Sequence, residues 1–187
     1  MKLMFASDIH GSALWCEKAL GVYEREKPEK LCLLGDILYH GPRNDLPEGH
    51  APKEVIKLLN PLKNEIICVR GNCDTEVDQM VLEFPVLADY ALIYADGHEL
   101  FLTHGHIHTP NNLPPIPSGS VMINGHTHIP KAEQVNGVHC LNCGSTALPK
   151  ENTPHSVLIY EDGAFRWLDI ATGGVFMEYG LEKTGIV

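Results

Sequence analysis

Seven side chains in the sequence are of types that bind divalent metal ions. They are Asp8, His10, Asp36, Asn72, His104, His126 and His128. Carboxylate oxygens and imidazole nitrogens are ligands for Mn, Fe, Zn and similar ions. Seven candidates are too many for one catalytic ion, whereas a carboxylate such as that of Asp36 can bridge two. These residue types therefore predict a centre of two metal ions.

Two adjacent ions suit the hydrolysis of a phosphate ester. At a separation of about 3.5–4 Å, they lower the pKa of a bridging water and clamp a phosphoryl group. The resulting hydroxide attacks phosphorus in line with the leaving oxygen, while the cations neutralise charge on the equatorial oxygens. Cysteine ligands are scarce in this set, which argues against a structural zinc site.

Each candidate has a simpler explanation when it is taken alone. A single His is more often a core or surface residue than a ligand, and the sequence contains 11 of them. Asp36 and Asn72 each follow a glycine and could be turn residues, because Asp, Asn and Gly favour turns. A turn, however, does not require all of these residue types together.

The positions of the candidates favour a shared site, because each closely follows an apolar segment that is typical of a buried strand. These segments are 3–7, 30–34, 65–70, 98–103 and 121–123. In open α/β sheets, ligands bind beyond the carboxyl ends of the strands. We therefore expect the candidate ligands to meet at one edge.

The first half of the chain is expected to alternate strands with helices. Helices are predicted near 12–26, 52–60 and 75–82, with Ser12 as an N-cap and Pro52 in a first turn. This alternation predicts parallel pairing through right-handed crossovers.

Three hairpin signals mark the second half, which is expected to be mainly antiparallel. They are Asp96-Gly97, Asn136-Gly137 and Asp162-Gly163. Together the two halves predict an α/β fold with two facing sheets and helices outside, in a single domain over 1–187. The segment 172–187 contains no recognisable motif.

Composition and charge restrict the class of protein. A hydrophobic fraction of 44% and a charged fraction of 20% are typical of a soluble globular protein. The net charge of −10 argues against tight binding of polynucleotides or anionic membranes. A small anionic substrate remains compatible, because bound cations can reverse the local field. A homo-oligomer is also compatible with this composition.

The N-terminal apolar run ends at Asp8, too early for a signal peptide, and no apolar run is long enough to span a membrane. A cytoplasmic location is therefore expected, with the six cysteines as reduced thiols. Cys140 and Cys143 are the one close pair, and a single pair makes a poor zinc ribbon.

The ordered motifs resemble those of the calcineurin-like metallophosphoesterase superfamily. They are Asp8-x-His10, Gly35-Asp36, Gly71-Asn72-x-Asp74, His104-Gly105-His106 and Gly125-His126-x-His128. Segments 5–12, 40–49 and 70–74 more closely resemble a subgroup of small bacterial phosphodiesterases. The resemblance implies a four-layer αββα sandwich with two mixed sheets, and two divalent ions, with manganese expected.

The resemblance also implies how the ligands divide between the two ions. One ion would take Asp8, His10, Asp36 and His128, and the other Asp36, Asn72, His104 and His126. The residues expected to act in catalysis are Asp36, Asn72, Cys73 and Asp74.

Cys73 departs from the broader family, which has a His at this position that assists the leaving group. The bacterial subgroup shares the Cys. A thiol is a weak hydrogen-bond donor, so diesters with good leaving groups are the expected substrates.

The long loop after Asp36 is the expected substrate-binding segment, because loops of this length are often functional. Arg43 could hold a phosphate oxygen with its planar guanidinium or could be a solvated surface residue. His40 and Asn44 are weaker candidates for the same pocket. His106 could compensate for Cys73 or could hydrogen-bond behind the metal ligands.

The function predicted from these features is that of a metal-dependent phosphodiesterase acting on a small diester. A nucleotide or phosphomonoester phosphatase with the same metals stays open as an alternative. So does a protein-binding scaffold of the same fold, because the retromer subunit that resembles these enzymes also lacks the usual His. The complete ligand set and the loop 40–44 favour the enzyme.

Overall fold

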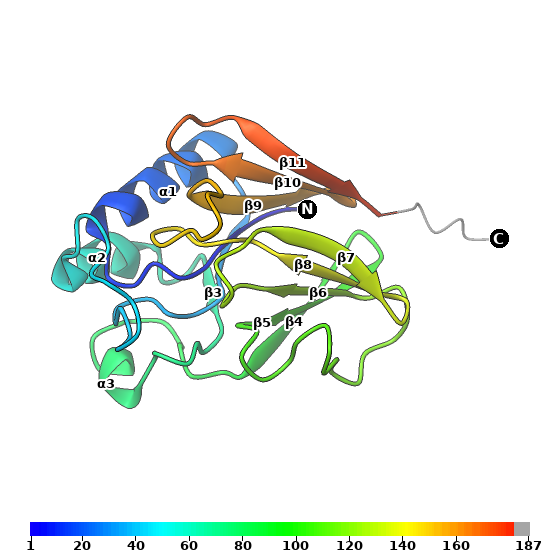
Figure 1. Ribbon diagram of the computed structural model, residues 1–187, viewed down its shortest axis with the longest axis horizontal. Helices are drawn as coiled ribbons and strands as arrows, with labels where there is room; N and C mark the ends of the chain where they lie inside the picture. Colours follow the sequence, from blue (N-terminus) through cyan, green and yellow to red (C-terminus); the bar gives the residue numbers. More distant parts are fainter. Residues whose placement is uncertain (182–187) are drawn as a thin grey trace.

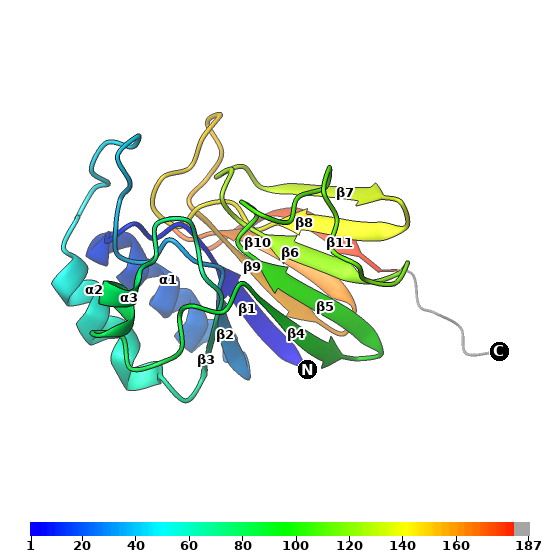
Figure 2. The same ribbon diagram turned by 90° about the horizontal axis from the view of Figure 1, so that it is seen from below.

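The computed structural model describes residues 1–181, whose strands form two sheets (Figures 1 and 2). The six-stranded sheet contains β1 (Lys2–Ala6), β2 (Lys30–Leu33), β3 (Ile66–Cys68), β9 (Ser156–Glu161), β10 (Ala164–Asp169) and β11 (Val175–Gly180). The five-stranded sheet contains β4 (Tyr90–Ala95), β5 (His98–Thr103), β6 (Val121–Asn124), β7 (Lys131–Val135) and β8 (Val138–Asn142). Their spatial orders are β11-β10-β9-β1-β2-β3 and β4-β5-β6-β8-β7.

The helices are α1 (Ala13–Glu26), α2 (Pro52–Leu59) and α3 (Glu76–Gln79), with a 3₁₀ turn at Asn60–Leu62. Ser12 caps α1, since its side chain accepts a hydrogen bond from the Trp15 amide. The helix expected over 75–82 is confined to α3, where Thr75 and Asp78 form a capping box. None of the helices in residues 1–181 is long and apolar enough to cross a membrane.

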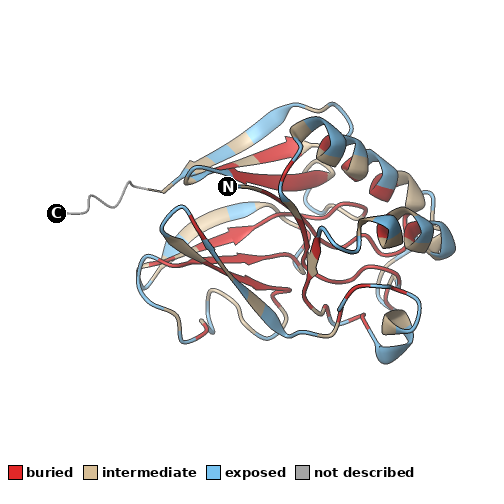
Figure 3. Cartoon of the chain, turned by 180° about the vertical axis from the view of Figure 1, so that it is seen from behind, coloured by how far each residue is buried: buried red, intermediate tan, exposed pale blue. Residues whose placement is uncertain are grey.

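The main core lies between the two sheets, where the inward faces of the central strands are buried (Figure 3). Phe5 and Trp167 from one sheet meet Leu100 and Val121 from the other. On the outer face of the six-stranded sheet, α1 and α2 bury a second cluster. Because the two sheets pack face to face, the loops that follow their parallel strands lie next to one another.

The outer face of the five-stranded sheet is partly covered by the loop 104–120 and not by a helix. Leu113 and Ile116 of this loop pack on Phe101 and Met122. Prolines at 110, 114, 115 and 117 prevent helix formation there, because proline lacks an amide donor and clashes with the preceding turn.

Both sheets are mixed, as predicted. β1 pairs in parallel with β2, and β2 with β3, so these strands end at the same edge. The three predicted hairpins are present, and Asp96, Asn136 and Asp162 have φ values of 51°, 51° and 50°. Each is followed by a glycine at positive φ, which is the geometry of a type I′ turn.

Two features of the second half were not predicted. β6 pairs in parallel with both β5 and β8, although the chain between them makes no helical crossover in the described residues. The segment 172–187, which has no motif, provides the edge strand β11 antiparallel to β10. Residues 182–187 lie outside the described part of the chain.

Candidate active site

All seven predicted metal ligands lie at one end of the two sheets, where the parallel strands finish. Asp8 and His10 follow β1, Asp36 follows β2 and Asn72 follows β3. From the facing sheet, His104 follows β5, and His126 and His128 follow β6. Because these strands run in parallel, all seven predicted ligands lie at the same end of the sheets.

One group of donors surrounds the Asp8 carboxylate. The Oδ1 atom of Asp8 is 3.2 Å from Nε2 of His128 and 3.6 Å from Nε2 of His10. The two imidazole Nε2 atoms are themselves 3.4 Å apart. Asp8 and His10 are fully buried and His128 is 3% exposed, so these groups are shielded from bulk solvent.

A second group surrounds His104 and shares Asp36 with the first. Nε2 of His104 is 3.1 Å from Oδ1 of Asn72, and Nδ1 of His126 is 3.2 Å from Nε2 of His104. The Oδ2 atom of Asp36 is 3.5 Å from Nε2 of His104 and 3.7 Å from Nε2 of His10. Asp36 therefore stands where a carboxylate could bridge two ions.

Backbone carbonyls orient three of the imidazoles. Nδ1 of His10 lies 2.8 Å from the Tyr39 carbonyl, Nδ1 of His104 lies 2.7 Å from that of Leu34, and Nδ1 of His128 lies 2.6 Å from that of Leu148. An Nδ1–H that donates to a carbonyl leaves the Nε2 lone pair free. In each ring, that lone pair faces the cluster.

The cluster has the properties of a metal site, because its polar atoms do not all satisfy one another by hydrogen bonds. The buried Oδ1 of Asp8 accepts no hydrogen bond, and two Nε2 lone pairs face each other at 3.4 Å. A buried, unpartnered carboxylate oxygen costs free energy unless a cation or proton satisfies it. Oxygen and nitrogen donors of this kind fit divalent ions such as Mn, Fe or Zn.

Protons compete with metal for these donors. Burial by itself would raise the pKa of Asp8, but the adjacent imidazoles of His10 and His128 outweigh it and hold this pKa well below its usual range. Burial lowers the pKa of His10, but the Asp8 carboxylate more than compensates and raises it. Because the ligands must be deprotonated, metal affinity falls as pH is lowered.

Five of the predicted ligands have left-handed backbone conformations, which are uncommon for residues other than glycine. The φ values are 56° for Asp8, 48° for His10, 54° for Asp36, 68° for His126 and 65° for His128. Each such conformation costs of order 1–3 kcal/mol, and such costs are tolerated mainly at functional sites. The strain turns the side chains back into the cluster directly after each strand.

Two glycines permit the close approach of the ligand loops. A Cβ at Gly71 would lie 2.1 Å from Oδ1 of Asp36. A Cβ at Gly125 would lie 2.0 Å from Oγ of Ser7 and 2.6 Å from Oδ2 of Asp8. Glycine at positions 71 and 125 is therefore required by packing between the loops.

We expect Gly71→Ala to lower metal affinity and to destabilise the fold by about 1–3 kcal/mol, because the added methyl displaces the Asp36 carboxylate. The matched control is Gly21→Ala in α1, where a Cβ meets nothing within 4 Å and alanine is the better helix former. Titration of each variant with Mn²⁺ and thermal melts measure the two effects. Equal metal affinity in Gly71→Ala and the wild type would contradict this account.

Asp74 lies behind the predicted ligands and joins the loops that carry two of them. Its carboxylate accepts hydrogen bonds from the amides of Asp36, Ile37 and Gly71 at 2.8, 2.9 and 2.7 Å. Burial raises the pKa of Asp74, although these amides oppose the shift. Both oxygens are thus occupied in joining the loop after β2 to the loop after β3.

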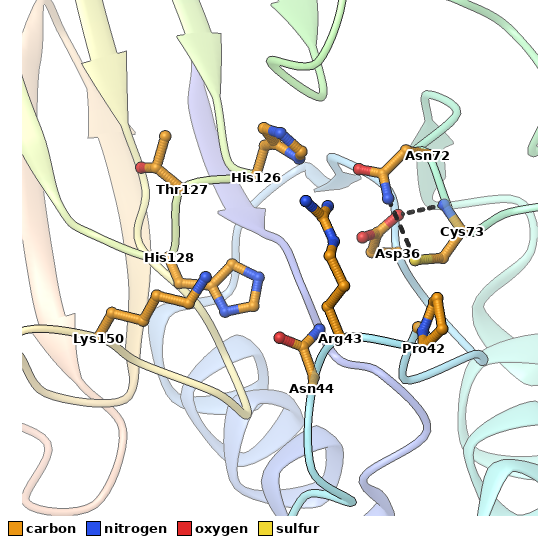
Figure 4. A pocket seen from close by; sticks show the side chains of 11 residues that line it. Asp36, Pro42, Arg43, Asn44, Asn72, Cys73, His126, Thr127, His128 and Lys150 are labelled. Atoms are coloured by element: carbon orange, nitrogen blue, oxygen red, sulfur yellow. Dashed lines mark hydrogen bonds between the residues drawn. The ribbon is translucent and has the colours of Figure 1, made fainter.

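Cys73 lies beside the cluster, with its amide donating to Oδ1 of Asp36 at 2.8 Å (Figure 4). Burial, followed by the charge of Asp36, raises the pKa of the Cys73 thiol. The side-chain amide of Asn72 donates to its sulfur at 3.3 Å. The thiol is therefore neutral in this environment.

A pocket of about 380 Å³ opens over the cluster (Figure 4). Its lining consists of Asp36, Gly41, Pro42, Arg43, Asn44, Asn72, Cys73, His126, Thr127, His128 and Lys150. The guanidinium of Arg43 reaches in between His126 and Asn72, and Lys150 extends beside His128. Sequence reasoning missed Lys150, because it stands in a segment without a motif.

The remaining candidates lie around this pocket. Asn44 lines it and donates a hydrogen bond to the His40 carbonyl at 2.8 Å. His40 is absent from the described lining, and its ring packs edge-on against Tyr39 and His50. His106 lies on the far side of the cluster, with its ring 5.4 Å from that of His104 and 6.2 Å from that of His126.

Residues 1–162 match the calcineurin-like phosphoesterase superfamily domain. The chain belongs to this superfamily. This phosphoesterase is 49% identical over 156 residues to phosphodiesterase YfcE of Escherichia coli K12, a match that covers 83% of the chain and 85% of the relative. It is 28% identical over 152 residues to phosphodiesterase MJ0936 of Methanocaldococcus jannaschii, covering 77% of the chain and 83% of that relative.

Solved structures agree with the sandwich fold that the motifs implied. The E. coli phosphoesterase YfcE matches with a TM-score of 0.94 at 42% identity, over 97% of this chain and all of its own. Vps29 of Entamoeba histolytica, solved with Zn²⁺, matches with a TM-score of 0.64 at 19% identity, over 97% of this chain and 100% of its own. The second likeness shows the fold alone. As a member of the superfamily, the protein is a hydrolase that acts on phosphoric ester bonds.

Proposed function

We propose that this phosphoesterase is a metal-dependent phosphodiesterase that cleaves a small diester. The observation that carries the proposal is the shared Asp36 carboxylate between two groups of donors, at 3.7 Å from His10 and 3.5 Å from His104. The likeness to two proteins named as phosphodiesterases supports a diester rather than a monoester.

Asp8, His10, Asp36 and His128 would hold one divalent ion, and Asp36, Asn72, His104 and His126 the other, with manganese as the expected metal. When bound, two such ions supply Lewis acidity toward the phosphoryl oxygens and an activated water for in-line attack. Asp74 fixes the position of Asp36 through backbone amides. We therefore assign Asp74 a positioning role within the catalytic set predicted from the sequence.

Arg43 and Lys150 would hold the phosphate group from two sides of the pocket, since they are the cationic side chains in its described lining. Cys73 is a neutral thiol with its sulfur beside Asn72, so we assign it no strong proton transfer to the leaving group. Weak acid assistance favours diesters whose leaving group is already a good one.

The test is hydrolysis of bis(4-nitrophenyl) phosphate and of 4-nitrophenyl phosphate by metal-stripped protein, with Mn²⁺, Mg²⁺, Zn²⁺ or no metal restored. We expect turnover only with metal, and faster turnover of the diester. Preference for the monoester would instead establish a phosphomonoester phosphatase. Absence of turnover with every metal, in folded protein, would favour the scaffold.

We expect Arg43→Met and Lys150→Met each to raise KM for the diester about tenfold, because each removes a charge-assisted hydrogen bond to phosphate. Both side chains are solvent-exposed, so the effect falls at the low end for charged groups. Lys53→Met, at an exposed position of α2, is the matched control. An unchanged KM in both pocket variants would remove these residues from the substrate site.

A further inference from the structure

A second and larger pocket adjoins the metal-ligand cluster, and His126 is the one predicted ligand in its described lining. Its volume is about 850 Å³, compared with about 380 Å³ for the pocket over the cluster. His126 and Thr127 line both pockets, so the two share a wall. Small-molecule sites generally have volumes of roughly 300–1,000 Å³, and a phosphate group alone needs far less space.

The fold produces this pocket because the loop 104–120 covers only part of the outer face of the five-stranded sheet. Leu113 and Ile116 pack on one part of that face. The pocket lies between the start of the loop and the edge strand β7, since residues of both line it. Side chains alternate along a strand, so Lys131, Glu133 and Val135 of β7 face the hollow.

The lining suits an organic group that has both apolar surface and hydrogen-bonding atoms. Val135, Ile129 and Cys140 give apolar surface, while Asn111 provides an amide group. His106 faces the pocket with a buried Nδ1 that has no hydrogen-bond partner. A buried polar atom without a partner is costly unless a ligand or water satisfies it.

The charges of the lining disfavour a second phosphate. Lys131 is paired with Glu133 at 2.8 Å, and Glu151 adds a further negative charge. The neighbouring residue Lys150 lines the pocket over the cluster instead. The loop after β8 therefore places the Lys150 cation beside the phosphate site and the Glu151 carboxylate beside the larger pocket. Figure 2 shows this loop at the same end of the molecule as the loop 40–50.

We propose that the larger pocket, here called the arm pocket, binds one ester arm of the substrate, and that this arm is an uncharged group of nucleoside size. The inference rests on the proposed function, in which the phosphate occupies the neighbouring pocket. The shared wall at His126 and Thr127 lets one diester occupy both pockets. His106 is then a specificity residue that meets the arm, and not a group that reacts with phosphorus.

The experiment compares binding of inorganic phosphate and of thymidine 5′-phosphate to the Mn²⁺-loaded protein by calorimetry. Val135→Trp fills the arm pocket from β7, and Thr109→Trp fills it from the opposite loop. Gln134→Trp is the matched control, because this residue is on the other face of β7 and is not part of the described lining.

We expect both filled variants to weaken binding of thymidine 5′-phosphate about tenfold and to leave binding of inorganic phosphate within about twofold of the wild type. The control should change neither. The same pattern should appear in kcat/KM for the 4-nitrophenyl ester of thymidine 5′-phosphate compared with methyl 4-nitrophenyl phosphate.

The result is read from the tryptophan variant that keeps the wild-type melting temperature. If that variant binds both ligands less tightly to the same extent, or binds both as tightly as the wild type, the assignment of the arm pocket is overturned. Failure of the proposed function would look different. In that case the metal-loaded wild type itself would neither bind inorganic phosphate nor hydrolyse either diester.

Discussion

Asp36→Asn is expected to lower kcat for a diester by about a thousandfold or more, because it removes several kcal/mol of metal-based stabilisation of the transition state. Oδ2 of Asp36 lies between the two donor groups, at 3.5 Å from His104 and 3.7 Å from His10. An amide at this position carries no charge, and its NH₂ group is a poor metal ligand. The substitution therefore weakens both metal positions at once.

The fold should survive this substitution. The backbone amide of Asp36 still donates to Asp74, and the amide oxygen of an Asn can still accept from the Cys73 amide. Circular dichroism and a thermal melt check the fold, and Mn²⁺-dependent hydrolysis of bis(4-nitrophenyl) phosphate gives kcat. Asp162→Asn is the matched control, since Asn-Gly suits the same hairpin turn. Activity within about tenfold of the wild type would show that Asp36 does not bridge the ions.

Restoring metal to the stripped protein is expected to raise its melting temperature by about 5 to 11 °C. An ion present at a hundred times its Kd stabilises the folded state by about 2.7 kcal/mol. For a chain of this size, each kcal/mol raises the melting temperature by about 2–4 °C. The structure gives the reason, since buried Asp8, His10 and His128 direct lone pairs at one another.

Scanning calorimetry at increasing Mn²⁺ concentration measures this effect. Asp8→Asn should lose most of the metal-dependent shift, because its carboxylate joins two imidazoles. Asp162→Asn, at a surface turn, should keep it. A full shift in Asp8→Asn would mean that the stabilising ion binds at some other place in the protein.

The thermal shift and the kinetic result separate binding of metal from catalysis. A scaffold with the same fold could bind metal and melt at a higher temperature without hydrolysing a diester. An enzyme must show both effects, and both must disappear in Asp36→Asn. The two measurements together therefore distinguish the phosphodiesterase from a binding platform.

The sequence determined the identities of the candidate ligands because their signal is local. Each stands directly after an apolar strand, and parallel strands necessarily end at one edge of a sheet. The hairpin turns were predictable for the same reason, since Asp-Gly and Asn-Gly adopt the required positive φ values. The first three strands and the helices between them also follow from local periodicity and capping.

The tertiary structure alone decided which distant groups meet. The parallel pairs of β6 with β5 and β8, and the addition of β11 at the edge, depend on burial across the whole sheet. Nothing near Lys150 in the sequence indicates that its loop reaches the phosphate pocket. Asp74 has the residue type of a ligand, but packing directs its oxygens to backbone amides.

The same distinction explains His40 and the arm pocket. His40 stands in the loop expected to bind substrate, but the loop's own conformation turns its ring toward Tyr39 and His50. The arm pocket exists because a proline-rich loop leaves part of a sheet uncovered, and this depends on how the loop packs. Local sequence thus determined the donors available for chemistry, whereas long-range packing decided their distances, their orientations and the space left for a substrate.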